Sequence, residues 1–135
     1  MIKIIATERG VDVFGSGAFH APRGDHLHNG VDFMCMAGNK VCSNVDGVVT
    51  KLGYTYADDL NFRYVEITDD NDNRVRFFYV KPSVIVGQII EDGDVIGISQ
   101  NLDTRYKGIT NHVHLEVKLH NDMFINPLTY FKKGE

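Results

Sequence analysis

The stretch His112-Val113-His114-Leu115-Glu116-Val117-Lys118-Leu119 decides the fold of this chain. Its apolar residues stand at every second position from Val113 to Leu119, with polar residues between them. Because successive side chains of a strand point to opposite faces, this period of two predicts a strand with one buried face. The other face then carries His112 and His114 side by side, where both imidazoles can reach one ion or one bound water. A solvated strand face that carries polar residues is the alternative interpretation.

Short apolar runs continue outward from this stretch and are separated by clusters of Gly, Asn and Asp. Helical periodicity is hard to find, so the pattern predicts an all-β fold. The Gly-rich segment Gly15–Gly30 is expected to be a loop. The expected strands are Lys3–Ile5, Val31–Met34, Lys40–Cys42, Val48–Leu52, Tyr64–Thr68, Val75–Val80, Val84–Val86, Val95–Ser99, His112–Leu119 and Met123–Ile125.

Length and composition limit the possible classes of protein. The 135 residues suffice for one domain, expected to span 1–135, and the apolar fraction of 43% is typical of a globular chain. The formal net charge is -4 and no basic run appears, which argues against nucleic acid as a partner. No apolar run reaches the length of a membrane span or of a signal peptide. We therefore expect that the chain is made in a host cytoplasm and does not insert into a membrane.

Two features have ordinary structural interpretations. Cys35 and Cys42 are too few for a disulfide framework. They are interpreted as two small buried apolar residues rather than as a pair. The acidic run Asp69-Asp-Asn-Asp-Asn73 faintly matches a calcium loop, but Arg74 stands where that loop needs Gly. We interpret the run as a hairpin turn.

A second candidate ligand pair lies in His28-Asn29-Gly30-Val31-Asp32. A Gly turn lets a His and an Asp four residues apart fold back onto one point, and both side chains suit zinc. The alternative is a capping Asp with an exposed loop His. Together with the late pair, two His and one Asp supply the three ligands of a catalytic zinc site, and one further His remains beside the metal. His26 is a rival ligand, but the spacing to Asp32 favours His28.

At this point the sequence resembles the lysostaphin/LytM-type zinc endopeptidases, which cut peptide bonds in bacterial cell-wall peptidoglycan. The resemblance covers about residues 13–131, and its specific part is a His-x-x-x-Asp motif followed by a late His-x-His. The matching pieces are Gly17-Ala-Phe19, Ala21-Pro-Arg-Gly24, His28-x-Gly-Val-Asp32, Ala37-Gly38, Val45-Asp-Gly-Val-Val49, Phe78-Tyr-Val80, Val86-Gly-Gln88, Gly93-x-Val-Ile-Gly97, Tyr106-x-Gly-Ile109, His112-Val-His114 and Asn126-Pro127.

The resemblance implies a fold, a cofactor and a substrate. Its zinc ligands fall on His28, Asp32 and His114, and His112 falls on a catalytic position beside the metal. The implied fold is a compact antiparallel β-sandwich or barrel-like domain of the duplicated hybrid motif type, with a groove over the zinc. The implied activity is that of a zinc (Zn2+) endopeptidase acting on a stem peptide or cross-bridge of peptidoglycan.

One position departs from the family pattern. Active members usually carry a second catalytic His in a Tyr-x-His segment, and here Lys81 takes that place in Tyr79-Val80-Lys81-Pro82. This variant is similar to the leukocyte cell-derived chemotaxin branch, which binds zinc and is generally regarded as non-proteolytic, and to short phage-encoded relatives. Lys81 is nevertheless the second candidate catalytic residue, as an ammonium near a developing oxyanion. Strand alternation predicts that Lys81 continues the face of Val75, Phe77 and Tyr79 and reaches the groove.

These observations leave three functions open. The first is a phage or prophage endopeptidase that acts at the cell wall, free or as part of a virion and in contact with tail proteins. The second is a zinc-binding module on the same fold that holds a cell-wall or protein partner. The third is a structural role in a virion, with the metal as a staple. Lys81 is the feature that separates the first function from the others.

Overall fold

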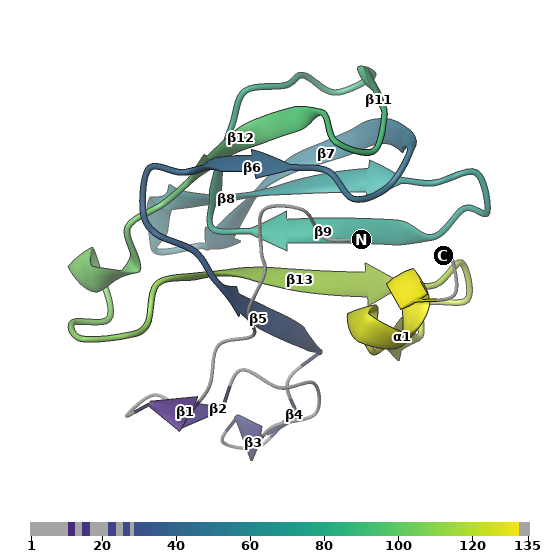
Figure 1. The fold of residues 1–135 in the computed structure, drawn as a ribbon. Coiled ribbons are helices and arrows are strands. Elements are labelled where there is room, and N and C mark those ends of the chain that lie inside the picture. Colours follow the sequence, from purple (N-terminus) through teal and green to yellow (C-terminus); the bar gives the residue numbers. More distant parts are fainter. Residues whose placement is uncertain (1–10, 13–14, 17–21, 24–25, 28, 133–135) are drawn as a thin grey trace.

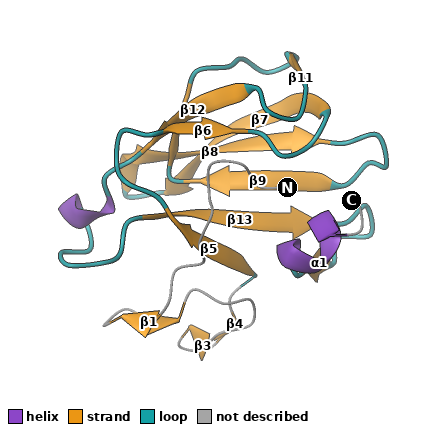
Figure 2. Cartoon of the chain, in the orientation of Figure 1, coloured by secondary structure: helices purple, strands orange, loops and turns teal. Residues whose placement is uncertain are grey.

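The computed structural model describes residues 11–12, 15–16, 22–23, 26–27 and 29–132, and its regular structure is almost entirely β (Figure 1 and Figure 2). The predicted all-β fold is confirmed. In this part of the chain, helix is confined to α1 (Pro127–Lys132) and the 3-10 turn η1 (Leu102–Thr104). The strands are β1 (Val11–Asp12), β2 (Gly15–Ser16), β3 (Pro22–Arg23), β4 (His26–Leu27), β5 (Gly30–Met34), β6 (Lys40–Cys42), β7 (Gly47–Tyr56), β8 (Asp59–Thr68), β9 (Arg74–Phe78), β10 (Val80–Pro82), β11 (Ile89–Ile90), β12 (Val95–Ser99), β13 (His112–Lys118) and β14 (Phe124–Ile125).

A seven-stranded antiparallel sheet contains β13, the strand that carries His112 and His114. Its order is β11-β7-β8-β9-β13-β14, and β5 also pairs with β13. Both β5 and β14 use the same edge of β13, because β9 pairs along the opposite edge. The first part of β13 lies opposite β5, and its last two residues lie opposite β14. This arrangement brings residues that are about 80 positions apart in the sequence onto neighbouring strands.

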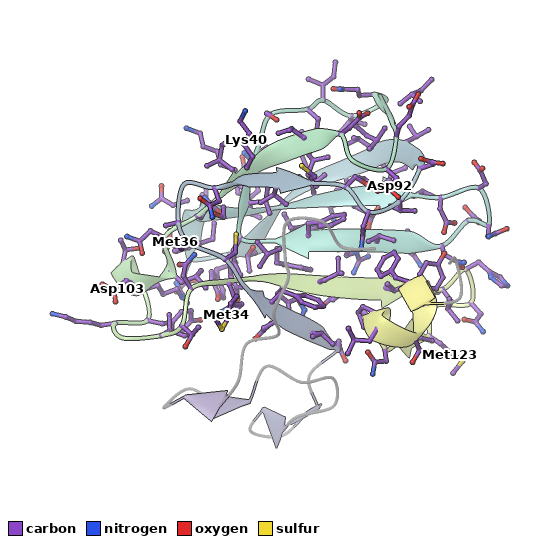
Figure 3. The ribbon with its side chains drawn as sticks, in the orientation of Figure 1. Met34, Met36, Lys40, Asp92, Asp103 and Met123 are labelled. Carbon is purple, nitrogen blue, oxygen red and sulfur yellow. The ribbon has the colours of Figure 1, made fainter. Side chains whose placement is uncertain are left out.

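A smaller three-stranded sheet, ordered β10-β12-β6, covers one face of the large sheet (Figure 1). Side chains from both sheets meet in one apolar cluster and fill the space between them (Figure 3). The small sheet contributes Val41, Val80 and Ile96, and all three are fully buried. The large sheet contributes Phe77 and Leu115 among others, also fully buried. Burial of side chains of this size stabilises a fold by roughly 1.5–3 kcal/mol each.

The predicted period of two along β13 is confirmed by burial. Val113, Leu115 and Val117 have no exposed surface and face the core. The alternate positions, which include His112 and His114, therefore face away from the core on the opposite side of the sheet. The apolar positions thus fix the direction in which the candidate site must face.

Several predicted boundaries need correction. The expected strand Val75–Val80 is interrupted at Tyr79, whose φ of 70° lies in the left-handed region that non-glycine residues rarely adopt. The expected strand Val84–Val86 is wrong, because Gln88 donates its N–H to the carbonyl of Ile85 and closes a turn there. The helix α1 was not expected, and Lys3–Ile5 lies outside the described residues.

Two ordinary interpretations are confirmed. The Asp69 side chain accepts hydrogen bonds from the N–H groups of Asn71 and Asn73, which closes the hairpin turn between β8 and β9. Cys35 and Cys42 are free thiols, the first buried in the core and the second half-buried. Among the described residues, no helix has the length and apolarity to cross a membrane.

Candidate active site

The candidate site is built on two neighbouring strands, β5 and β13. Asp32 lies directly opposite His114 in the antiparallel register. Its Oδ1 atom is 2.8 Å from His114 Nδ1, and its Oδ2 atom is 3.4 Å from His112 Nε2. One carboxylate therefore faces both imidazoles of the His-Val-His motif. The structure thus brings three of the candidate residues from the sequence together, Asp32, His112 and His114.

Gly30 permits the close approach of these two strands. A Cβ atom added there would lie 2.1 Å from the carbonyl oxygen of Leu115 and 3.0 Å from Cε1 of His114. Real Cβ atoms do not come that close to backbone, so a side chain at this position would push β5 away from β13. The glycine thus sets the distance between Asp32 and His114.

The three side chains are removed from solvent. The side chain of Asp32 is 3% exposed, that of His112 4% and that of His114 12%. Burial by itself would lower the pKa of His114, but hydrogen bonds to Asp32 and Glu116 and the charges of these carboxylates raise it to about 9. The site is therefore one in which a positive charge beside Asp32 is strongly favoured.

His112 is oriented by the backbone and by an aromatic ring. Its Nδ1 donates to the carbonyl oxygen of Thr110 at 2.8 Å, which leaves Nε2 on the side of Asp32. The ring of Tyr79 meets the ring of His112 edge to face, with centroids 5.4 Å apart. A neutral His112 in this orientation can accept a proton at Nε2.

A cluster of phenols surrounds this side of the site and was not found by sequence reasoning. The hydroxyl of Tyr56 is 2.9 Å from that of Tyr79 and 2.7 Å from that of Tyr106. Burial raises the pKa of Tyr79 to about 12, so its hydroxyl stays neutral. The guanidinium of Arg105 lies over the Tyr56 ring at 3.8 Å. Tyr79 and Tyr106 belong to two of the family motifs, Phe78-Tyr-Val80 and Tyr106-x-Gly-Ile109, but the motifs by themselves assign no role to the phenols.

A second set of residues that sequence reasoning missed lies beyond His114. Glu116 accepts a hydrogen bond from Nε2 of His114 at 3.0 Å, and Arg76 pairs with both Glu116 and Glu66. The alternation along β13 could have predicted the contact between His114 and Glu116, because Glu116 shares the face of His112 and His114. The contacts of Arg76 and Glu66 could be found only from the register of β8, β9 and β13, which the sequence does not give.

Three candidates from the sequence are not placed in the site. His28 lies outside the described residues, and of His26 only the backbone is described, in β4. Lys81 is exposed and lies in β10, where it pairs with Ile98 of β12. The prediction that Lys81 continues the face of Val75 and Phe77 is wrong, because those two side chains face the core. The left-handed residue Tyr79 shifts the alternation by one, so Val80 takes the buried side.

The donor set fits a zinc site in part. A carboxylate oxygen and an imidazole nitrogen at hydrogen-bond distance, on a buried and polar surface, are the ligand types that zinc takes. Within residues 29–132 and the short strands before them, no group of three His, Cys, Asp or Glu side chains forms a complete metal site. The third expected ligand, His28, belongs to the part that the structure does not describe.

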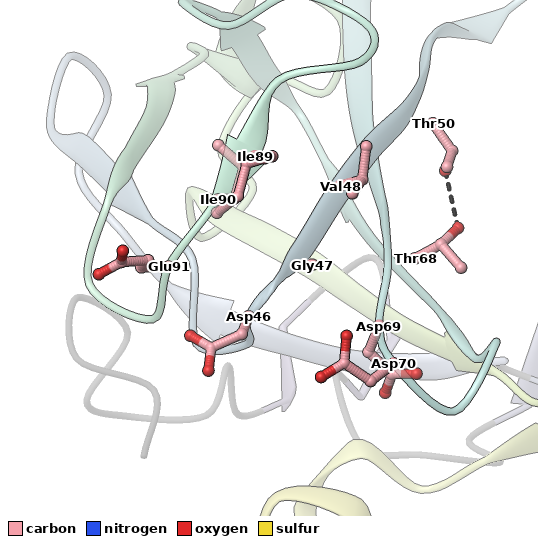
Figure 4. A pocket seen from close by; sticks show the side chains of 10 residues that line it. All are labelled: Asp46, Gly47, Val48, Thr50, Thr68, Asp69, Asp70, Ile89, Ile90 and Glu91. Carbon is pink, nitrogen blue, oxygen red and sulfur yellow. Dashed lines mark hydrogen bonds between the residues drawn. The ribbon is translucent and has the colours of Figure 1, made fainter.

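An open pocket of about 600 Å³ lies elsewhere, at the ends of β7 and β8 (Figure 4). None of the predicted site residues lines it. Thr50 and Thr68 hydrogen-bond to each other on its wall (Figure 4). Asp46 accepts the backbone N–H of Asp92, and Asp69 accepts that of Asn71. The carboxylates of Asp46 and Asp69 therefore already hold loop backbone.

Comparisons with known proteins agree with the geometry. The model of Peptidase family M23 matches residues 26–127. Leukocyte cell-derived chemotaxin-2 from Bos taurus is 29% identical over 108 residues, which cover 80% of this chain and 71% of that protein. The catalytic domain of the antimicrobial peptidase lysostaphin from Staphylococcus simulans shares the fold with a TM-score of 0.69 at 24% identity, over 87% of this chain and 90% of that one.

A prophage-encoded protein has the same fold. The catalytic domain of the M23 protein EnpA from Enterococcus faecalis matches with a TM-score of 0.62 at 18% identity, over 93% of this chain and 88% of that one. The resemblance inferred from the motifs is confirmed, and the matched region contains both the Asp32 segment and the His-Val-His strand. The chain belongs to peptidase family M23.

Proposed function

We propose that this chain is a zinc-dependent endopeptidase that cleaves peptide bonds in the stem peptides or cross-bridges of bacterial peptidoglycan. The observation that carries the proposal is the meeting of Asp32 with both imidazoles of the late motif, on the face of the sheet opposite the core. In a peptidase family this is a place for a metal and a general base together. Asp32 and His114 would hold the zinc with His28.

When bound, zinc supplies a Lewis acid that polarises a scissile carbonyl and makes water acidic enough to attack near neutral pH. The chain itself supplies the proton transfer. Since Nδ1 of His112 is engaged by the carbonyl of Thr110, its Nε2 takes a proton from the attacking water and later returns it to the leaving amine. The edge contact from Tyr79 keeps the ring of His112 from rotating out of this orientation.

A second function is favoured by Lys81, which stands where active relatives usually carry a His. A zinc-binding module that holds a cell-wall or protein partner without cutting it would have the same metal ligands. The likeness to chemotaxin-2 supports this alternative, and the likeness to lysostaphin supports the peptidase. The likeness to EnpA, which is prophage-encoded, supports a phage origin with synthesis in the host and action at the cell wall or in a virion.

One experiment separates the two functions. Purified peptidoglycan is incubated with the zinc-loaded protein, with the protein and a chelator, and with the His114→Ala variant. Loss of turbidity and new amino termini only in the first sample support the peptidase. Zinc bound at one ion per chain, without any new amino termini, supports the binding module. Absence of stoichiometric zinc would exclude both.

A further inference from the structure

A row of buried charges crosses three neighbouring strands beside the candidate metal ligands. Glu116 of β13, Arg76 of β9 and Glu66 of β8 lie directly opposite one another in register. The Nε atom of Arg76 donates to Glu66 at 2.8 Å, and its Nη1 atom lies 3.7 Å from Oε2 of Glu116. The side chain of Arg76 is only 19% exposed, that of Glu66 9% and that of Glu116 11%. Charges buried to this degree require specific partners, so the three side chains depend on one another for their positions.

The row ends on His114. Two residues from Glu116 on the same face of β13, His114 donates from Nε2 to Glu116 Oε1 at 3.0 Å. Its other ring nitrogen faces Asp32 at 2.8 Å. The ring of Phe78, directly opposite in the register, meets the imidazole edge to face with centroids 5.2 Å apart. The imidazole is therefore clamped between two carboxylates and against one aromatic ring.

This clamp gives each ring nitrogen of His114 its own carboxylate partner. A neutral imidazole has one N–H and one lone pair, and a carboxylate can only accept. Since both partners are carboxylates, both ring nitrogens donate, Nδ1 to Asp32 and Nε2 to Glu116. A metal held by His114 and Asp32 would take the place of the proton on Nδ1, while Glu116 would keep the proton on Nε2, so the ring is already turned for ligation through Nδ1.

Arg76 fits the task of holding Glu116 in place. Its distance of 3.7 Å to Oε2 of Glu116 is that of an ion pair and leaves the other oxygen, Oε1, to His114. Glu66 binds the Nε side of the guanidinium and is itself a hydrogen-bond acceptor for Thr50 at 2.8 Å. The side chain of Arg76 is thus fixed from the side away from the metal ligands.

We propose that Glu116 is a positioning residue for His114, and that Arg76, anchored by Glu66, holds Glu116. The proposal rests on the metal site of the proposed function, and it adds a residue that raises the affinity of this site for zinc. It assigns this role to a carboxylate that contributes no ligand and touches no substrate. The Glu66–Arg76–Glu116 row then contributes to zinc affinity through the orientation and basicity of one imidazole.

The test is zinc affinity, measured by competition with a chromophoric chelator. Glu116→Ala is expected to weaken zinc binding by about 10–100-fold. Glu116→Gln keeps the shape and an accepting oxygen, but it loses the charge that roughly doubles the strength of such a hydrogen bond. We therefore expect zinc binding to be weakened by roughly 3–10-fold. Asp122→Asn is the matched control, because it removes one negative charge from an exposed ion pair with Arg74 and leaves His114 untouched. Its affinity should equal that of the wild type.

A spectroscopic measurement separates positioning from loss of folding. In the zinc-loaded protein, nitrogen NMR of the His114 ring should show a protonated Nε2 with slow exchange, and in Glu116→Gln this proton should exchange faster. The absorption bands of the cobalt-substituted protein should shift in Glu116→Gln and stay unchanged in Asp122→Asn. If Glu116→Ala does not fold, Glu116→Gln and the NMR measurement decide.

Failure of the proposal and failure of the proposed function give different results. If the wild type binds no zinc, or His114→Ala binds as the wild type does, the metal site itself is wrong. If the wild type binds zinc and His114→Ala does not, while Glu116→Gln and every folded Glu116→Ala sample keep wild-type affinity, the positioning role is overturned. In that second case the proposed function stands without it.

Discussion

Replacing Arg76 with Met is expected to destabilise the metal-free protein by about 3 kcal/mol at neutral pH. The methionine side chain fills most of the volume of the arginine stem but carries no charge. Glu66 and Glu116 would then face the gap as two buried carboxylates with side chains 9% and 11% exposed. Removing one partner of a buried pair costs about 3–5 kcal/mol, and the residual exposure of Arg76, 19%, favours the lower end.

The effect should depend on pH with a definite sign. Burial alone would raise the pKa of Glu66, but the hydrogen bonds from Arg76 and Thr50 and the charge of Arg76 hold it below its usual range. A carboxyl of this kind stabilises the fold above its unfolded-state pKa of about 4.3, and its contribution is lost as pH falls through the folded value. The cost of Arg76→Met should therefore be largest near pH 7 and shrink below about pH 4.

Urea denaturation followed by circular dichroism, with a chelator present, measures this cost at both pH values. A loss of about 3 kcal/mol should lower the midpoint of thermal unfolding by roughly 10 °C in a domain of this size. Arg74→Met, two residues earlier on β9, is the control, because its partner Asp122 is exposed and surface pairs contribute little. Equal costs for the two variants, or a cost for Arg76→Met that does not change with pH, would refute the reasoning.

Three further predictions concern the site itself. Gly30→Ala should lower stability by about 2 kcal/mol or more, since its Cβ would meet the carbonyl of Leu115; thermal unfolding checks this, and an unchanged midpoint would contradict the close approach. His112→Ala should keep the zinc and lose hydrolysis, and zinc content as low as in His114→Ala would show that the two roles are wrongly assigned. Lys81→His should increase release of new amino termini from peptidoglycan if Lys81 merely impairs the family chemistry, while Lys81→Ala should abolish it if the ammonium stabilises the oxyanion. If neither change alters hydrolysis, Lys81 has no catalytic role.

Local pattern determined much of this protein. The alternation from Val113 to Leu119 by itself predicts a strand with a buried face, because side-chain direction in a strand depends only on position along it. The same rule puts His112 and His114 on one face, and the spacing in His28-x-Gly-Val-Asp32 identifies Asp32 as a ligand candidate. The turn at residues 69–73 follows in the same way from the tendency of Asp and Asn side chains to bind nearby backbone N–H groups.

Tertiary structure alone decided which side chains meet across strands. Asp32 and His114 are opposite each other because of a register between segments about 80 residues apart, and no local rule fixes that register. The Glu66–Arg76–Glu116 row depends on two such registers at once. Lys81 was misplaced for the same reason. The left-handed backbone of Tyr79 moves the chain from one sheet to the other. It is held by hydrogen bonds to the backbone of Arg63 in β8 and of Gln100 after β12, so it leaves no trace in the alternation of the sequence.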